Sequence, residues 1–145
     1  MIYREIKNYE FFELIENLTY QNQDIIEAKE FGFDSVQDAF WKAERSYARF
    51  WTISHKETVL ATILEQRDGT LTFFTTVDLP THSMRRFVKV LRKLVIKVTK
   101  CREAVFVRVA SWYKPAQTLL RTVGFKPMVL ENHYSIWVYE YGKQD

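Results

Sequence analysis

The sequence predicts one α/β domain built on a mixed, mostly antiparallel sheet that helices flank, and three observations support this. The 145 residues suit a single domain, 1–145, and the 47% of hydrophobic residues can form a core without disulfides or metals. The spacing of apolar residues changes from helical to alternating after residue 46, and it returns to helical near residue 83. The strand–helix–strand unit over 71–110 implies one parallel strand pair, because such a crossover returns the chain in the same direction.

The first third of the chain predicts one strand and three helices. Ile2–Ile6 alternates as a strand does. The helices are expected over Tyr9–Asn17 after an Asn8 cap, over Gln23–Phe31 up to Gly32, and from a Ser35 cap to about Glu44. The second of these helices takes Ile25, Ile26, Ala28 and Phe31 as its apolar positions.

The remaining two thirds predict a strand meander followed by alternating helices and strands. The meander comprises Arg49–Ser54, Thr58–Leu64 and Leu71–Val77, and Asp68-Gly69 favours a tight turn before its last strand. The clearest helix covers Ser83–Lys100, with Phe87, Leu91 and Leu94 expected to face the sheet. A strand over Ala104–Ala110, a helix from Pro115 to Val123 and strands over Met128–Glu131 and Tyr134–Tyr141 complete the order.

Several protein classes are excluded by composition. The single cysteine, Cys101, cannot form an internal disulfide, and with three scattered histidines it leaves no cysteine-based zinc site. No apolar run approaches 18 residues, so we expect no membrane span. The N-terminus, MIYREIKNYE, carries charges where a signal peptide needs an apolar stretch. We therefore expect a cytoplasmic protein.

The charges are distributed unevenly. Residues 1–46 carry ten acidic and five basic side chains, whereas residues 81–102 carry eight basic and no acidic ones. The cations of the helix fall within an arc of about 140° on a helical wheel. Three interpretations stay open. This face is solvated, or Arg85 and Arg86 bind phosphate, or it binds a protein partner or DNA through Lys89, Arg92, Lys93, Lys97 and Lys100.

The order of elements, with the ending YKPAQTLLRTVGFKPMVLENHYSIWVYEY, resembles the GNAT (GCN5-related N-acetyltransferase) superfamily. The similarity is most specific at Gly124-Phe125 and covers roughly residues 47–141 as topology. The segments DIIEAKEFGF, FFTTVDLPTHSMRRFVKVLRKLV and AVFVRVASWYKPAQTLLRTVGF also resemble the small GNAT-like internal virion proteins of short-tailed phages. The resemblance implies a GNAT-like acyl-CoA N-acyltransferase fold, and for a phage protein it implies location in the host cytoplasm or the virion.

The resemblance also implies where a site would lie. In GNAT enzymes the pantetheine arm of acetyl-CoA binds between two splayed strands, here 71–77 and 104–110, and the pyrophosphate binds at the following helix N-terminus. The implied cofactor-binding residues are Val77, Asp78, Leu79, His82, Ser83, Met84, Arg85 and Arg86. The candidates for acid–base chemistry are Glu65, Asp78 and Tyr113.

Three positions depart from the GNAT pattern. The loop Pro80–Arg86 contains no glycine, Leu120 stands where a proton-donating tyrosine is usual, and Ser111 or Trp112 replaces a common asparagine. These departures favour a non-catalytic phage protein of virion assembly, with a degenerate acyl-CoA site and a partner that is a virion component, a second copy or DNA. The alternative is an acetyl-CoA-dependent N-acetyltransferase that acts on an unidentified amine.

Overall fold

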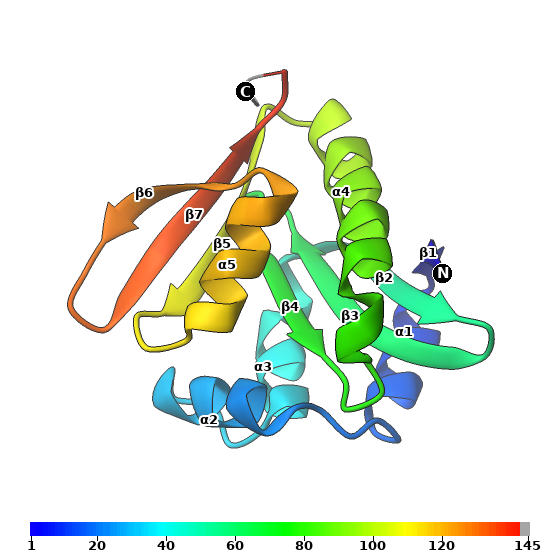
Figure 1. The fold of residues 1–145 in the computed structure, drawn as a ribbon. Helices are drawn as coiled ribbons and strands as arrows, with labels where there is room; N and C mark the ends of the chain where they lie inside the picture. The colour runs from blue at the N-terminus through cyan, green and yellow to red at the C-terminus, as the bar shows by residue number, and fades with distance from the viewer. Residues whose placement is uncertain (143–145) are drawn as a thin grey trace.

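The computed structural model describes residues 1–142 as two small sheets set edge to edge, with helices on both sides (Figure 1). The strands are β1 (Ile2–Ile6), β2 (Tyr47–His55), β3 (Thr58–Gln66), β4 (Leu71–Thr75), β5 (Ala104–Ala110), β6 (Lys126–Leu130) and β7 (Tyr134–Glu140). The α-helices are α1 (Asn8–Ile15), α2 (Asn22–Glu30), α3 (Val36–Ala43), α4 (Met84–Lys100) and α5 (Lys114–Val123). Short 3-10 turns, η1 (Glu44–Ser46) and η2 (Thr81–Ser83), precede β2 and α4.

Each sheet is antiparallel throughout. The first has the order β1-β2-β3-β4, and the second has the order β5-β7-β6. The β2–β3 hairpin turns at Lys56, which adopts φ 56°. The expected parallel pair is reduced to a single bridge between Thr70 and Phe106, so β4 and β5 are neighbours that scarcely pair. The strand–helix–strand pattern therefore predicted the direction of these strands correctly, and their separation agrees with the splayed strands that the GNAT resemblance implied.

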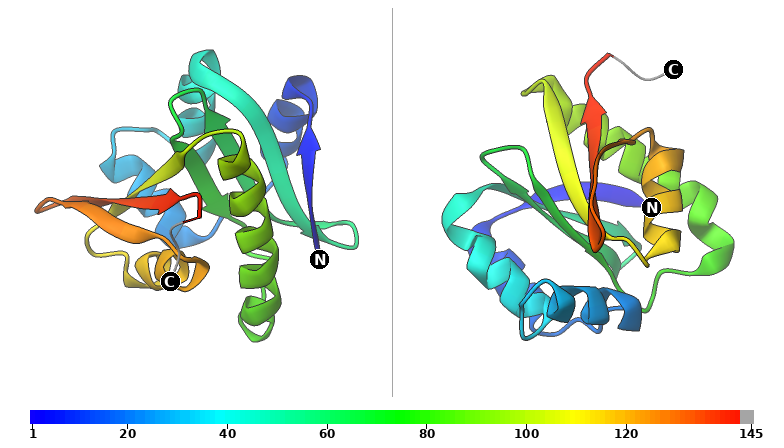
Figure 2. Two further views of the ribbon diagram at one scale, coloured as in Figure 1. Left: turned by 90° about the horizontal axis from the view of Figure 1, so that it is seen from above. Right: turned by 90° about the vertical axis from the view of Figure 1, so that its left-hand side faces the viewer.

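The helices form a layer on each face of the first sheet (Figure 2). Helices α1, α2 and α3 lie on one face and α4 lies on the other, with α5 beside α4 and next to the second sheet. Successive strand residues serve opposite layers, because side chains alternate along a strand. Phe50 belongs to the core under α1–α3, and Trp51 belongs to the core under α4 and α5. This alternation explains how an aromatic-rich meander fills two cores at once.

Most element boundaries agree with the prediction, and the exceptions have local causes. Ser35 caps α3 as expected, since its Oγ accepts the Asp38 N–H at 3.0 Å. Asn8 does not cap α1 but is its first residue, after a Lys7 without a side-chain cap bond. Strand β4 ends at Thr75, not Val77, because the Thr76 hydroxyl accepts the Asp78 N–H in a turn. Ile26 of α2 is exposed.

The face of α4 that meets the sheet is as predicted, since Phe87, Leu91 and Leu94 are all buried. We expect Leu91→Ala to lower the free energy of unfolding by about 2–5 kcal/mol, because it leaves a cavity at a side chain that is 4% exposed. The matched control Lys93→Ala, on the exposed face of the same helix, should stay within about 0.5 kcal/mol. Urea titrations of both variants measure this, and equal stabilities would show that the assigned helix register is wrong.

No helix among residues 1–142 is both long and apolar enough to cross a membrane. No group of three or more His, Cys, Asp or Glu side chains in the same residues could hold a metal ion.

Candidate active site

The site begins where β4 and β5 separate. At the closed end the Phe106 N–H donates to the Gly69 carbonyl at 2.9 Å, beside the Thr70–Phe106 bridge. Gly69 has φ +94°, and a Cβ there would lie 3.0 Å from the Ala104 carbonyl oxygen. Only glycine combines this backbone conformation with such a close approach. Beyond this contact the two strands diverge, and the backbone edges between them are left without strand partners.

The hydrogen bonds at the end of β4 show which of its backbone groups point towards β5. The Thr76 N–H donates to Leu60 of β3 at 2.9 Å, so Thr75 directs its backbone groups the other way, towards the gap. Phe73 lies two residues earlier and shares this direction, because backbone groups alternate along a strand. Its N–H and carbonyl therefore face the gap between the strands.

Helix α2 spans the open end of the gap through two carboxylates. Asp24 Oδ2 accepts the Thr75 N–H at 2.7 Å and the Thr75 hydroxyl at 3.0 Å. Glu27 Oε2 accepts the Ala110 N–H at 2.9 Å. The two acids are three residues apart, so they share one face of the helix. Asp24 thus holds the end of β4 and Glu27 holds the end of β5.

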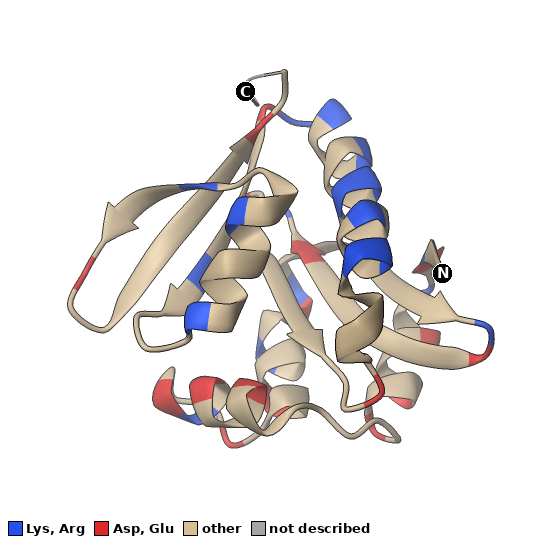
Figure 3. Ribbon diagram, in the orientation of Figure 1, with Lys and Arg blue, Asp and Glu red and all other residues tan. Residues whose placement is uncertain are grey.

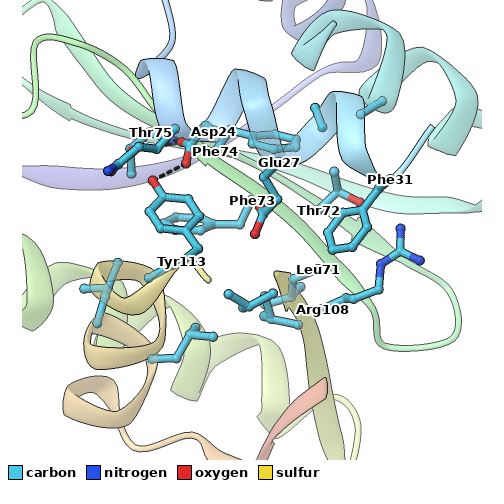
Figure 4. Close-up of a pocket in the computed structure, with 18 of the residues that line it drawn as sticks. Asp24, Glu27, Phe31, Leu71, Thr72, Phe73, Phe74, Thr75, Arg108 and Tyr113 are labelled. Atoms are coloured by element: carbon cyan, nitrogen blue, oxygen red, sulfur yellow. Dashed lines mark hydrogen bonds between the residues drawn. The ribbon is translucent and has the colours of Figure 1, made fainter. Parts of the chain in front are cut away.

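The loop between β5 and α5 closes over the same carboxylates. The Tyr113 hydroxyl donates to Asp24 Oδ1 at 2.5 Å, and both side chains are buried (Figure 4). The Trp112 indole N–H donates to the Glu30 carboxylate at the end of α2. Both oxygens of Asp24 are therefore occupied by hydrogen bonds. This makes Asp24 a positioning group at the head of the gap.

A cavity of about 750 Å³ runs through the gap. Its lining comes from both sides of the first sheet: Leu79, Met84 and Leu119 near α4 and α5, and Asp24, Glu27, Phe31 and Arg108 near α2. Figure 4 shows the Glu27 carboxylate pointing from α2 into this space. Two molecules that enter from opposite faces could meet beside Glu27.

Burial sets the protonation of the site. Glu27 is 8% exposed, and its burial raises the pKa of its carboxyl to about 7, aided by the nearby Asp24 charge and opposed by the Ala110 N–H. Burial also raises the pKa of Asp24 against the bonds from Tyr113 and Thr75. The pKa of Tyr113 is raised first by burial and then by Asp24, so its hydroxyl keeps its proton.

Glu27 is the residue best placed to move a proton. Its Oε1 accepts no hydrogen bond from the described residues, while Oε2 is fixed by the Ala110 N–H. A carboxyl with a pKa near 7 is half ionised at neutral pH, which suits a general base. Sequence reasoning missed both acids. The available signal was that Asp24 and Glu27 occupy the helical face of Ala28 and Phe31, where apolar residues are expected.

Only one of the three residues proposed from the sequence for acid–base chemistry lies in the cavity. Tyr113 lies in the site, as described. Glu65 lies outside the cavity lining, where it forms ion pairs with Arg49 at 2.9 Å and Arg102 at 2.7 Å. Asp78 is exposed in the turn after β4 and does not line the cavity either. The structure therefore places neither candidate in the lining of this cavity.

The loop expected to bind cofactor lies at the α4 side of the cavity. Leu79 and Met84 line the cavity, whereas Val77, Asp78, His82, Arg85 and Arg86 are exposed and Ser83 is half-buried. The 3-10 turn η2 leads directly into α4, so Arg85 and Arg86 project from the first turn of the helix. Their role in anion binding stays a prediction.

Basic residues recur along α4 (Figure 3), and one of them is bonded to the neighbouring helix. Arg92 is part of the fold, because its guanidinium donates to the Thr122 carbonyl at 2.6 Å and the Val123 carbonyl at 3.2 Å. It thereby satisfies two carbonyls at the C-terminal end of α5. Lys89, Lys93, Lys97 and Lys100 are exposed. These four stay a predicted contact face for a protein partner or DNA.

Comparison with solved structures shows which fold this is. The chain is similar to the GNAT domain of PAT from S. lividans, with TM-score 0.70, 10% identity and coverage of 95% of this chain and 89% of that one. The chain has the GNAT fold. It is also similar to spermidine N-acetyltransferase from Vibrio cholerae in complex with CoA and spermine, with TM-score 0.66, 10% identity and coverage of 97% and 95%. Ribosomal-protein-S18-alanine N-acetyltransferase from Escherichia coli gives TM-score 0.64, 12% identity and coverage of 99% and 95%.

No protein-family model matches the sequence, and no curated protein sequence matches it. Identities of 10–12% therefore carry the GNAT fold and nothing finer. The sequence-based assignment of the fold is confirmed, and the similarity to phage internal virion proteins finds no support in these comparisons.

Proposed function

We propose that this protein is an acetyl-CoA-dependent N-acetyltransferase with Glu27 as its general base. The observation that carries the proposal is the buried Glu27 carboxyl, with one free oxygen and a pKa of about 7, in a cavity that passes between two splayed strands. Fold neighbours that carry out N-acetylation add support. The virion-assembly interpretation has no comparable support.

The residues around the gap fit CoA in one respect and restrict it in another. The backbone of Phe73 faces the gap and offers a donor and an acceptor to an extended arm with amide groups. The loop before α4 contains no glycine, so side chains there hinder close approach of phosphate to the backbone. Arg85 and Arg86 would then bind the pyrophosphate through their guanidinium groups.

The chain's own groups would act on the amine as follows. The amine nitrogen forms a C–N bond to the thioester carbonyl carbon of acetyl-CoA, and the C–S bond breaks. CoA leaves as a thiolate, which takes up the second proton that the nitrogen loses when the amide forms, so that the products are the acetylated amine and the CoA thiol. Glu27 Oε1 takes the proton that the ammonium group must lose before its nitrogen can attack. The Ala110 N–H holds the other oxygen, so the carboxyl keeps its orientation. Asp24 and Tyr113 position the head of the gap.

The proposal predicts two measurements on the unmodified protein. Calorimetric titration with acetyl-CoA should give a dissociation constant in the micromolar range, and thiol release should depend on added amine. A dissociation constant at or above ~1 mM, or thiol release that no amine stimulates, would restore the interpretation of a degenerate site.

The anion-binding role of the α4 N-terminus can be tested by charge reversal. We expect Arg85→Glu/Arg86→Glu to weaken acetyl-CoA binding by roughly 10-fold or more, since charged hydrogen bonds to phosphate are lost. The matched control Lys93→Glu/Lys97→Glu, later on the same helix, should leave that affinity unchanged. Calorimetry at fixed ionic strength compares the two sets, and an equal loss in both would point to a general charge effect.

A further inference from the structure

The cavity has a second polar group, of opposite charge to the first. Arg108 lines the cavity from β5, and its guanidinium carbon lies 3.9 Å from the centroid of the Phe31 ring. The same guanidinium lies 5.9 Å from the centroid of Tyr134 on β7. Two aromatic faces therefore hold this cation at the cavity wall.

The position of Arg108 follows from the strand pattern. Val107 and Val109 are buried in the core beneath α4 and α5, so Arg108 points to the opposite face, towards α2. Ala110 pairs with Tyr134, which makes Tyr134 the diagonal neighbour of Arg108 on that face. Phe31, which follows the end of α2, stacks on the guanidinium from the side of that helix. The stacking is thus built by β5, β7 and α2 together.

The N–H donors of Arg108 have no acceptor among residues 1–142. Among the described residues, no hydrogen bond or ion pair is made by its guanidinium, although a guanidinium carries five N–H donors in a fixed fork. Stacking on aromatic rings leaves the edge of the guanidinium available for a planar anion. Arg108 is also exposed, so a ligand in the cavity can reach it.

We propose that the acceptor amine also carries a carboxylate, and that Arg108 binds this carboxylate while Glu27 receives the amine. This inference rests on the proposed function and names its substrate class. The cavity holds Glu27 and Asp24 on α2 and a free guanidinium on β5, which suits an acceptor with a cationic and an anionic end. A simple diamine would place its second cation near Arg108, whose charge repels it.

The test uses acceptors that differ only in the carboxylate. Unbranched ω-amino acids from glycine to 6-aminohexanoate are compared with n-alkylamines of matched chain length, as substrates with acetyl-CoA. We expect at least one amino acid to exceed its matched alkylamine in kcat/KM by roughly 10- to 100-fold, as a charge-assisted bidentate contact allows. Arg108→Met should remove this preference mainly through KM, and Arg108→Lys should keep part of it.

Arg121→Met is the matched control. Arg121 also stacks on an aromatic ring, with 5.2 Å between its guanidinium carbon and the Trp137 centroid, but it does not line the cavity. This variant should leave the amino-acid preference unchanged. Thermal melts of all variants confirm that they are folded before kinetics are compared.

A binding measurement separates this inference from the proposed function. Saturation-transfer NMR detects contact between each amino acid and the protein without acetyl-CoA, and the signal should weaken in Arg108→Met but not in Arg121→Met. Transfer to alkylamines and amino acids alike, unaffected by Arg108→Met, would overturn the carboxylate inference and leave the acetyltransferase standing. Amino-acid contact that depends on Arg108, without any acetyl transfer, would do the reverse. Contact that is absent or insensitive to Arg108 would also overturn the inference.

Discussion

Replacing Glu27 by glutamine is expected to lower kcat/KM for acetyl transfer by about 10²–10⁴-fold, while the folded protein becomes more stable above pH 7. Glutamine keeps an oxygen that can accept the Ala110 N–H, so the α2–β5 contact survives. It cannot take a proton from an ammonium group, and activity is therefore lost.

The gain in stability follows from the direction of the pKa shift. Burial raises the pKa of Glu27 from 4.5 to about 7, so the folded state favours the protonated carboxyl. The stability that the protonated Glu27 carboxyl provides to the folded state is fully present below about pH 4.5 and is lost as the pH rises through 7. The ionised carboxyl then opposes folding by on the order of 3 kcal/mol, which Glu27→Gln removes.

Melting curves and steady-state kinetics of the same preparations test both halves of this prediction. Glu27→Gln and the unmodified protein should melt alike near pH 4.5 and diverge by pH 8, with the variant higher. In the unmodified protein the rise of kcat with pH should have a midpoint near 7. Glu13→Gln, an exposed acid on α1, serves as the control in both measurements. A Glu27→Gln variant that retains full activity would remove the general base from the mechanism.

Glu65→Gln is expected to have the largest effect on stability among these variants, with a loss of about 3–5 kcal/mol in the free energy of unfolding. Glu65 is 1% exposed and accepts hydrogen bonds from Arg49, Arg102 and the Trp51 indole. Removing its charge leaves two partly buried guanidinium groups without their counter-ion. Uncompensated buried charge costs more than an ion pair contributes, so the loss falls on the folded state.

Urea unfolding at pH 7 measures this loss against Glu57→Gln, an exposed acid in the β2–β3 turn. The control should stay within about 0.5 kcal/mol of the unmodified protein. If Glu65→Gln unfolds at the same urea concentration as the control, the two ion pairs contribute nothing to the fold. If it instead abolishes transfer without loss of stability, Glu65 belongs to the chemistry after all.

The order of elements was predictable because local patterns decide it. The 3–4 spacing of α4 and the alternation of β2 and β3 are visible in short windows of sequence, and the burial of Leu91 and Ile63 confirms them. The separation of β4 from β5 was not predictable in this way. It depends on Gly69 contacting Ala104 across 35 residues of chain and on carboxylates from a third element.

The acids of the site were missed for a related reason. Asp24 and Glu27 read as ordinary polar residues of a surface helix, and nothing near them in sequence shows that β4 and β5 end there with unpaired N–H groups. Glu65 shows the converse case. Its position on a strand made it a candidate base, but the sequence did not reveal that Arg49 and Arg102, from a different strand and a loop, form ion pairs with it. Only the tertiary contacts distinguish the two cases.

Strands β4 and β5 are fixed relative to each other at two places, by the close contact at Gly69 and by α2 at the ends where they have separated. Helix α2 joins the separated ends through Asp24 and Glu27, and in the proposed reaction Glu27 also receives the acceptor amine. A substitution in α2 that adapts the site to a new acceptor therefore also changes the distance between β4 and β5. That distance would in turn change the affinity for acetyl-CoA bound between the two strands. If the proposed function holds, acceptor choice and donor affinity should therefore change together when α2 changes. A library that randomises α2 should return the two traits as correlated, whereas one that randomises the α4 surface should leave both as they are.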